Sequence, residues 1–318
     1  MYFRYIRIII LLIFIFNYLF FHLFNIYFLK QKNSCICVIG KKENLYVREF
    51  ANYYKNIGLN KIFIYDNNDL DDERFDLVLK DFVDDRFVEI IDYRGKIASQ
   101  LEAWEDCRKK NFKSFNWLIF FDMDEFLFLR NFSNINDFLN QKIFDKCQRI
   151  QLNWFLHTDN NLLYYDNRTL EERFPEKIKK WKNKKIGGID IIKSILKGNI
   201  DIEINDNHCL NYKLISCDGF GKVKNVQGIK TNESDHYYYY IDHYWSKSTQ
   251  EFVNKLMRGD AILGNKNKKN NLRRIRLYFS INDLTVDKIN YIENMTKYNL
   301  SKYRKRLKKR TKTELHKF

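Results

Sequence analysis

The amino-acid sequence predicts an α/β protein whose central sheet is mostly parallel and carries helices on both faces. Three observations predict this class: short apolar runs alternate with segments of helical spacing, several of these runs end at a carboxylate residue, and no internal repeat is present. Strands that alternate with helices form βαβ units, and such units build parallel sheets. Because open α/β sheets bind ligands beyond the carboxyl ends of their strands, we expect a ligand site at that edge.

The N-terminal segment is predicted to be a membrane anchor. The run from Ile8 to Leu29 contains no charged residue and is rich in Ile, Leu and Phe. As a helix it would rise about 33 Å, which is enough to cross a hydrocarbon core of roughly 30 Å. No small-residue cleavage site follows, so a retained anchor is favoured over a cleaved signal peptide. Basic residues flank the run on both sides and leave its orientation open.

We therefore expect a single-pass membrane protein, placed in a Golgi or other secretory membrane if eukaryotic and in the inner membrane if bacterial. The predicted organisation has three parts: a transmembrane anchor over residues 1–32, a main domain over residues 33–263, and a basic, helical tail over residues 264–318.

The main domain begins with alternating strands and helices. Apolar residues that recur every three or four positions predict the helices, and short apolar runs predict the strands. The expected strands are Cys35 to Ile39, Lys61 to Tyr65, Phe87 to Ile91 and Trp117 to Phe121, and the expected helices are Glu43 to Ile57, Asp71 to Phe82 and Lys96 to Lys110. Gly58 stands where a helix C-cap is expected.

The rest of the domain has a weaker pattern. Further strands are expected at Gln148 to Asn153, Ile189 to Leu196 and Tyr237 to Ile241, and a helix at Ser248 to Met257 that Gly259 closes. The stretch from His157 to Lys185 is polar and irregular.

The net charge of +16 limits the classes of binding partner that the protein is expected to have. Such an excess is compatible with nucleic acid, an anionic membrane surface, or an anionic substrate such as a nucleotide diphosphate. No nucleic-acid-binding motif surrounds the basic clusters, so we expect no nucleic-acid partner. The basic tail is interpreted either as a solvated helix end or as a membrane-surface contact.

The cysteines do not form a recognisable metal or disulfide pattern. The six are Cys35, Cys37, Cys107, Cys147, Cys209 and Cys217. No pair has CxxC spacing, which argues against a structural zinc site. We expect buried free thiols, with a bond between Cys209 and Cys217 as the alternative in an oxidising compartment.

The sharpest chemical signal is WLIFFDMDEFL, from Trp117 to Leu127. Two carboxylates two residues apart leave a buried strand in an open turn, where both can reach one hard divalent cation. Such a cation neutralises a diphosphate and stabilises it as it leaves. Asp122 and Asp124 are therefore predicted metal ligands, and Glu125 supports the turn or faces the substrate. The competing interpretation is a solvated turn, but the position after a fourth alternating strand favours the metal site.

A second signal is DHYWSKSTQEF, which begins at Asp242. His243 follows an apolar run and is predicted to give a nitrogen ligand to the same metal. Lys247 and Arg258 are predicted to hold phosphates, Lys as a point charge and Arg as a bidentate fork. The alternative is a structural histidine and two surface charges.

The chain resembles the family 92-like and family 2-like glycosyltransferases. The matching pieces are ENLYVREFANYYKNIGLNKIFIYDNN, then Gln100 followed by AWEDC, then FFDMDEFL, and later HYWSKS and KLMRG. The resemblance implies a GT-A-type nucleotide-diphospho-sugar transferase fold, a nucleotide-sugar donor and Mn²⁺ or Mg²⁺. It implies that Asp66, Asn67, Asp92 and Gln100 lie on the donor side. Lys193, Ser194 and His208 lie in weaker matching pieces.

The acceptor and the base remain open. The segment NWFLHTDNN around His157 departs from the small-residue, glycine-containing loop expected from the resemblance, so it does not identify the acceptor. A glycan, a lipid and a protein are all candidate acceptors. If the reaction inverts, a carboxylate must deprotonate the acceptor hydroxyl. Glu233, Asp235 and Asp242 are candidates, and no local pattern selects one.

Two other functions compete with a glycosyltransferase. A haloacid-dehalogenase-like phosphatase also has a DxD after an apolar strand, but it carries that motif after its first strand and has Thr or Val where Phe126 stands. A non-catalytic, membrane-anchored binding protein with the same fold is the second alternative.

Overall fold

The computed structural model describes residues 33–178, 191–224, 238–259 and 268–315, together with residue 13 and residues 15–18. The chain divides into two compact units, Met1–Asn33 and Ser34–Phe318. The predicted anchor lies almost entirely outside the described residues. Among the residues that are described, no helix has both the length and the apolar character needed to cross a membrane. The second unit contains the central sheet.

The first half of the sheet is parallel, as predicted. Its strands lie in the order β3-β2-β1-β4. They are β1 (Ser34–Gly40), β2 (Lys61–Asp66), β3 (Val88–Asp92) and β4 (Trp117–Phe120), and every pairing among them is parallel. The helices α2 (Asn44–Asn56) and α5 (Gln100–Asn111) connect them within the predicted helical segments, although α5 begins at Gln100 instead of the predicted Lys96. Gly58, at φ 82°, follows the end of α2.

One predicted helix begins later than expected and is broken. Instead of a helix from Asp71, the structure has α3 (Phe75–Val78) and α4 (Lys80–Asp84). Ion pairs hold the preceding residues in a loop, with Lys41 Nζ 2.6 Å from Asp69 and Lys42 Nζ 2.7 Å from Asp72.

The second half of the sheet corrects the prediction of a mostly parallel sheet. β7 (Ile192–Lys197) runs antiparallel between β4 and β6 (Arg149–Leu156), β10 (Tyr239–His243) pairs parallel with β6, and β5 (Glu125–Leu129) closes the order antiparallel to β10. The short strand β8 (Ser216–Cys217) pairs with β6, and β9 (Val223–Lys224) pairs with β8. β5 was not expected, because its apolar residues directly follow the aspartates that were interpreted as an open turn. The fold is therefore a mixed α/β fold.

Helices cover both faces of the parallel half, as predicted. Successive residues of a strand point to opposite faces. Ile36 and Val38 of β1 pack in one core cluster with residues of α2, α3 and α4, whereas Cys35 and Cys37 pack in another with Trp104 of α5.

Two disulfides overturn the expectation of free thiols for four cysteines. Cys37 on β1 is bonded to Cys107 on α5, and Cys147 is bonded to Cys217 on β8. The alternative bond between Cys209 and Cys217 is wrong as well, because β8 pairs with β6 and carries Cys217 to Cys147. Cys35 and Cys209 are free and buried. Each bond joins residues 70 positions apart, so spacing along the chain carried no signal for it.

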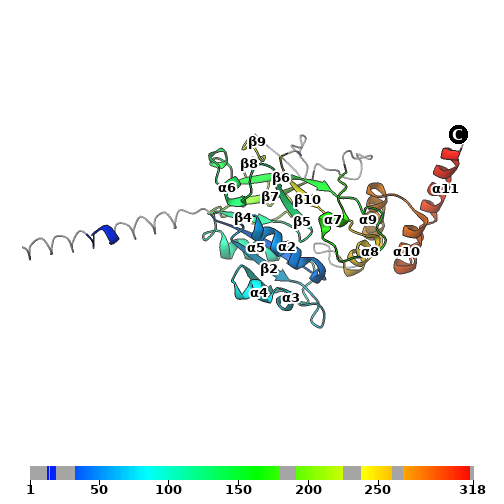
Figure 1. The fold of residues 1–318 in the computed structure, drawn as a ribbon, viewed down its shortest axis with the longest axis horizontal. Coiled ribbons are helices and arrows are strands. Elements are labelled where there is room, and N and C mark those ends of the chain that lie inside the picture. The colour runs from blue at the N-terminus through cyan, green and yellow to red at the C-terminus, as the bar shows by residue number, and fades with distance from the viewer. Residues whose placement is uncertain are drawn as a thin grey trace, which may run out of the picture. The chain divides into compact units, whose positions relative to one another are not determined.

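The C-terminal helices pack on one another through a third core cluster. They are α8 (Thr249–Arg258), α9 (Lys268–Ile281), α10 (Val286–Thr296) and α11 (Ser301–Leu315), drawn from yellow to red in Figure 1. Phe252 of α8, Tyr278 of α9 and Ile292 of α10 are buried in this cluster. The boundary predicted at residue 264 lies outside the described residues, and α9 beyond it packs against α8. The remaining short helices are α6 (Ile135–Leu139), η1 (Lys142–Phe144) and α7 (Leu170–Arg173).

Candidate functional site

A pocket of about 900 Å³ opens beyond the carboxyl ends of β1, β2 and β4, where the alternating pattern predicts a ligand site. The end of α8 and one side of α9 complete its wall. It is lined by six of the residues predicted for the site, namely Asn67, Gln100, Asp122, Asp124, His243 and Arg258. Three other predicted residues, Asp66, Asp92 and Lys247, are not part of its lining.

Asp122 lies just beyond the C-terminal end of β4, where two side chains hold it. Gln100 Nε2 donates to its Oδ1 at 2.7 Å, and Lys193 Nζ donates to its Oδ2 at 2.8 Å. The turn below it is fixed by Glu125, whose Oε2 accepts a hydrogen bond from the backbone N–H of Asp122 at 2.9 Å. Glu125 therefore supports the turn, which is one of its two predicted roles.

Asp124 meets the second motif. Its Oδ1 lies 3.4 Å from His243 Nε2, and its Oδ2 accepts a hydrogen bond from Lys255 Nζ of α8. The antiparallel pairing of β5 and β10 places His243 opposite Glu125, and this register brings the two motifs together. The DxD segment and the late histidine are thus neighbours in space, as the sequence predicted.

Burial and charge decide the protonation of this cluster. Burial alone would raise the pKa of Asp124, but the charge of Lys255 and the hydrogen bond from His243 outweigh it and hold that pKa well below its usual range. Burial acts on Asp122 in the same way, and Lys193 outweighs it to lower the pKa. Burial lowers the pKa of His243. The pocket therefore holds two ionised carboxylates beside a neutral imidazole.

The chemical types of these side chains are suitable for binding a hard divalent cation. Carboxylate oxygens and a neutral imidazole are suitable ligands. His243 Nδ1 is buried and has no hydrogen-bond partner in the described part of the chain. Across the same residues, no three His, Cys, Asp or Glu side chains already stand together as a metal cluster. Each aspartate instead contacts a lysine that an entering cation would have to displace.

Among the residues predicted to bind the donor, some line the pocket and others lie outside its lining. Asn67 lines the pocket and donates from Nδ2 to the carbonyl oxygens of Tyr93 and Lys96, both at 2.9 Å, so it joins the loops after β2 and β3. Asp66 instead accepts hydrogen bonds from Asn68. Asp92 is exposed and accepts from the backbone N–H of Arg94 at 3.0 Å.

Lys247 and Arg258, which were predicted as a pair of phosphate ligands, have different positions. Lys247 is 4% exposed, and its Nζ lies 3.4 Å from the centre of the Tyr46 ring and 3.2 Å from Glu43 Oε2. Arg258 lines the pocket and also contacts Glu43. Only Arg258 of this pair can therefore reach a ligand in the pocket.

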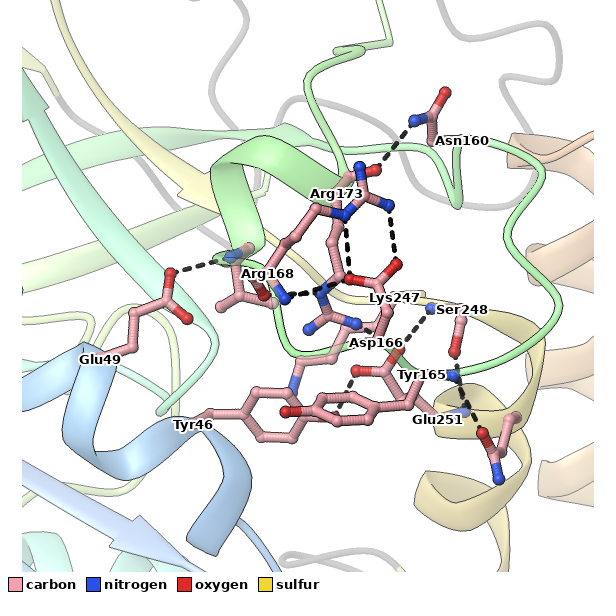
Figure 2. Close-up of polar contacts among 12 residues, drawn as sticks. Tyr46, Glu49, Asn160, Tyr165, Asp166, Arg168, Arg173, Lys247, Ser248 and Glu251 are labelled. Carbon is pink, nitrogen blue, oxygen red and sulfur yellow. Dashed lines mark hydrogen bonds and ion pairs between the residues drawn. The ribbon is translucent and has the colours of Figure 1, made fainter.

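A buried polar network lies behind Lys247 and fixes the start of α8 (Figure 2). Arg173 of α7 donates to Glu251 Oε2 at 2.8 Å, and the Tyr46 hydroxyl of α2 donates to Glu251 Oε1. Ser248 and Glu251 form a capping box at the start of α8. This network ties α2, α7 and α8 together, and α8 in turn carries Lys255 and Arg258 into the pocket.

Of the three candidates for a catalytic base, the structure describes Asp242, which does not line the pocket. Asp242 Oδ1 is bound by His157 Nε2 and by Lys177 Nζ, each at 2.7 Å, and Asp242 is outside the lining. Glu233 and Asp235 lie outside the described residues.

Several pocket residues carried little or no sequence signal. His208 lay only in a weak matching piece, and Trp154, Trp245 and Glu43 were not singled out as site residues. Trp154 lies on β6, and its buried Nε1 has no partner among the described residues. His208 Nδ1 lies 3.0 Å from the carbonyl oxygen of Ile192, so Nδ1 carries the proton and Nε2 can accept a hydrogen bond. The sequence indicated Lys255 as a pocket residue only through its spacing from Arg258, because residues three positions apart lie on the same face of a helix.

Comparisons with known proteins give a consistent family. The family model described as "Glycosyltransferase family 92" matches residues 31–271. A glycosyltransferase family 92 protein of Ricinus communis is 29% identical over 108 residues, which is 34% of this chain and 19% of the relative. A family 92 protein of Oryza sativa subsp. japonica is 28% identical over 110 residues, which is 35% of this chain and 18% of the relative. The matched segment thus spans about a fifth of the curated relatives.

Among solved structures, similarity is low. S. aureus TarS 1-349 in complex with UDP-GlcNAc has a TM-score of 0.39 and 11% identity, with 83% of this chain and 79% of that chain covered. The same protein in complex with UDP has a TM-score of 0.38 and 10% identity, with 78% of this chain and 70% of that chain covered.

Proposed function

Because the chain belongs to glycosyltransferase family 92, we propose that it is a GT-A-type enzyme that transfers a sugar from a nucleotide-sugar donor to an acceptor hydroxyl. The observation that carries the proposal is the meeting of Asp122 and Asp124 with Lys255 and Arg258 in one pocket at the strand ends. This arrangement supplies carboxylates for a metal and cations for a diphosphate in the same space. Neither the phosphatase nor the non-catalytic alternative is favoured by a specific observation.

The residues of this chain divide the work of donor binding. Asp122, Asp124 and His243 would hold Mn²⁺ or Mg²⁺, which when bound would supply positive charge for the departing diphosphate. Arg258 would bind a phosphate group through its guanidinium, and Lys255 would do so as a point charge. Asn67 keeps the loops after β2 and β3 in place beside the nucleotide, and Gln100 orients Asp122.

The acceptor side is proposed more broadly. A glycan, a lipid or a protein hydroxyl would enter beside Trp154 and His208, which both line the pocket. Burial, together with the charge of Lys193, lowers the pKa of His208 to about 4, so its imidazole is neutral at physiological pH. A neutral imidazole with a bare Nε2 accepts a hydrogen bond from a hydroxyl. We propose a membrane location from the apolar run within residues 1–32.

The test is a panel of nucleotide sugars incubated with the full chain and Mn²⁺, with release of the nucleoside diphosphate as the readout. We expect hydrolysis of one donor, and we expect Asp124→Ala to abolish it while the circular dichroism spectrum is unchanged. Turnover of that variant near the wild-type rate would contradict the metal assignment. Release of phosphate from a phosphomonoester, without turnover of any nucleotide sugar, would favour the phosphatase instead.

A further inference from the structure

Glu43 is a buried acid in the wall of a pocket that is proposed to bind an anion. It precedes α2, is 3% exposed and lines the pocket. A negative charge repels a diphosphate, so its position beside Arg258 needs a reason.

The contacts of Glu43 give that reason. Its Oε1 accepts a hydrogen bond from Arg258 Nη1, and its Oε2 lies 3.2 Å from Lys247 Nζ. Burial alone would raise the pKa of Glu43, but the charges of Arg258 and Lys247 outweigh it and lower the pKa, so the carboxylate is ionised. One acid thus holds two cations, of which only Arg258 lines the pocket.

Arg258 depends on this contact for its orientation. It is the last residue of α8, its side chain is 19% exposed, and the following residue Gly259 has φ 97°. Its Nη1 donates to the carbonyl oxygen of Lys41 at 2.6 Å and to Glu43, while its Nε and Nη2 have no partner among the described residues. A long side chain at a helix end loses considerable rotamer entropy when a ligand fixes it, and a prior contact removes part of that loss.

Lys247 secures Glu43 from the other side. Its ammonium stacks on the Tyr46 ring, and the Tyr46 hydroxyl donates to Glu251 of the buried network (Figure 2). On this side, the carboxylate of Glu43 is therefore held by Lys247, and neither Lys247 nor Tyr46 lines the pocket.

We propose that Glu43 is a positioning residue, which holds the guanidinium of Arg258 so that its remaining N–H groups face the diphosphate of the donor. This inference rests on the proposed function, because it takes the ligand of Arg258 to be a nucleoside diphosphate. It makes Lys247 a support for Glu43 instead of the phosphate ligand that the sequence predicted.

The direction in which Glu43→Gln changes diphosphate affinity distinguishes a positioning role of Glu43 from a purely electrostatic one. If Glu43 acted only through its charge, Glu43→Gln would remove a repulsion and tighten the binding of a diphosphate. If it positions Arg258, the same change weakens binding, by about five- to thirty-fold. Asp69→Asn is the matched control, because Asp69 also lines the pocket but pairs with Lys41.

The experiment measures the dissociation constants of UDP and GDP for the full chain by isothermal titration calorimetry, with Mn²⁺ and separately with EDTA. We expect weaker binding for Glu43→Gln and no weakening for Asp69→Asn. In the Arg258→Met background, Glu43→Gln should not change the dissociation constant further. The four proteins form a double-mutant cycle, which isolates the coupling between the two side chains. A merely structural role of Glu43 would lower the melting temperature without this dependence on Arg258.

Two outcomes overturn the inference while the proposed function stands. One is wild-type or tighter binding by Glu43→Gln, and the other is an equal loss with and without Arg258. If Glu43→Gln does not fold, Glu43→Asp takes its place in the same cycle, since it keeps the charge but shortens the reach to Arg258. If the wild-type protein binds neither UDP nor GDP, the inference and the choice of donor both fall.

Discussion

Glu251→Gln tests whether the buried network at the start of α8 stabilises the fold. Glu251 uses both carboxylate oxygens, Oε1 for the Tyr46 hydroxyl and Oε2 for Arg173 and for the backbone N–H of Ser248. Arg173 and Glu251 have side chains only 1% and 4% exposed. The substitution keeps the shape of the side chain but leaves the Arg173 guanidinium buried without its carboxylate partner.

The expected loss is large for a single substitution. Removing one partner of a buried ion pair costs about 3–5 kcal/mol, which corresponds to a fall in melting temperature of about 5–8 °C for a domain of this size. The measurement is urea unfolding followed by tryptophan fluorescence. The control is Asp84→Asn, which breaks an exposed pair with Lys80 whose side chains are 62% and 76% exposed, and it should cost less than about 0.5 kcal/mol.

The pH dependence of that loss has a definite sign. Burial alone would raise the pKa of Glu251, but the charge of Lys247 and the hydrogen bonds from Ser248 and Tyr46 outweigh it and lower the pKa. The carboxylate therefore stabilises the fold above its unfolded-state pKa, and this contribution is lost as the pH falls through the folded-state pKa. The difference between wild type and Glu251→Gln should shrink below about pH 4. A free energy of unfolding within about 1 kcal/mol of wild type at pH 7 would refute the reasoning.

Three further predictions concern the rest of the fold. Dithiothreitol should lower the free energy of unfolding by about 2–4 kcal/mol per disulfide, because each bond closes a long loop; an unchanged urea midpoint after complete reduction, verified by thiol titration, would contradict this. His208 binds its proton near pH 6.5 when unfolded but near pH 4 when folded, so stability should fall as the pH drops through this window, by about 3 kcal/mol at most, and His208→Gln should lose that slope in urea titrations at pH 7 and pH 5. A chain that begins at residue 33 should show the circular dichroism spectrum of a folded domain and bind UDP as the full chain does, because β1 begins at Ser34 and the two units are separately compact; a truncated chain without folded protein would count against a simple anchor.

The parallel half of the fold was predictable because each signal there is local. The strands β1, β2, β3 and β4 lie at their expected places, and the helices between them have a clear helical period. The DxD segment could be singled out for the same reason, since Asp122 and Asp124 directly follow a buried strand. Two helices differ: the one expected from Asp71 begins later, after ion pairs from Lys41 and Lys42 to the preceding loop, and α5 begins at Gln100 instead of Lys96.

The second half of the sheet, which mixes parallel and antiparallel pairings, was less predictable because long-range pairing decides it. β5 is five residues long and becomes a strand only through its pairing with β10, which is more than a hundred positions away. The two disulfides depend on similarly distant pairings. The position of Lys247 was not predictable, because a lysine beside an aromatic run does not reveal whether it faces the pocket or the Tyr46 ring.

The two halves of the sheet meet at the site and contribute opposite charges to it. The parallel half supplies Asp122 and Asp124, whereas Lys193 comes from the antiparallel strand β7 and Lys255 from α8, which follows β10. A buried carboxylate stays ionised only when a positive charge or hydrogen bonds outweigh its loss of hydration. In the proposed function, the DxD segment therefore depends on the strands of the second half of the sheet for the charges that keep it ionised. A variant that disturbs the pairing of β5 with β10 should weaken nucleotide binding before it affects the parallel half.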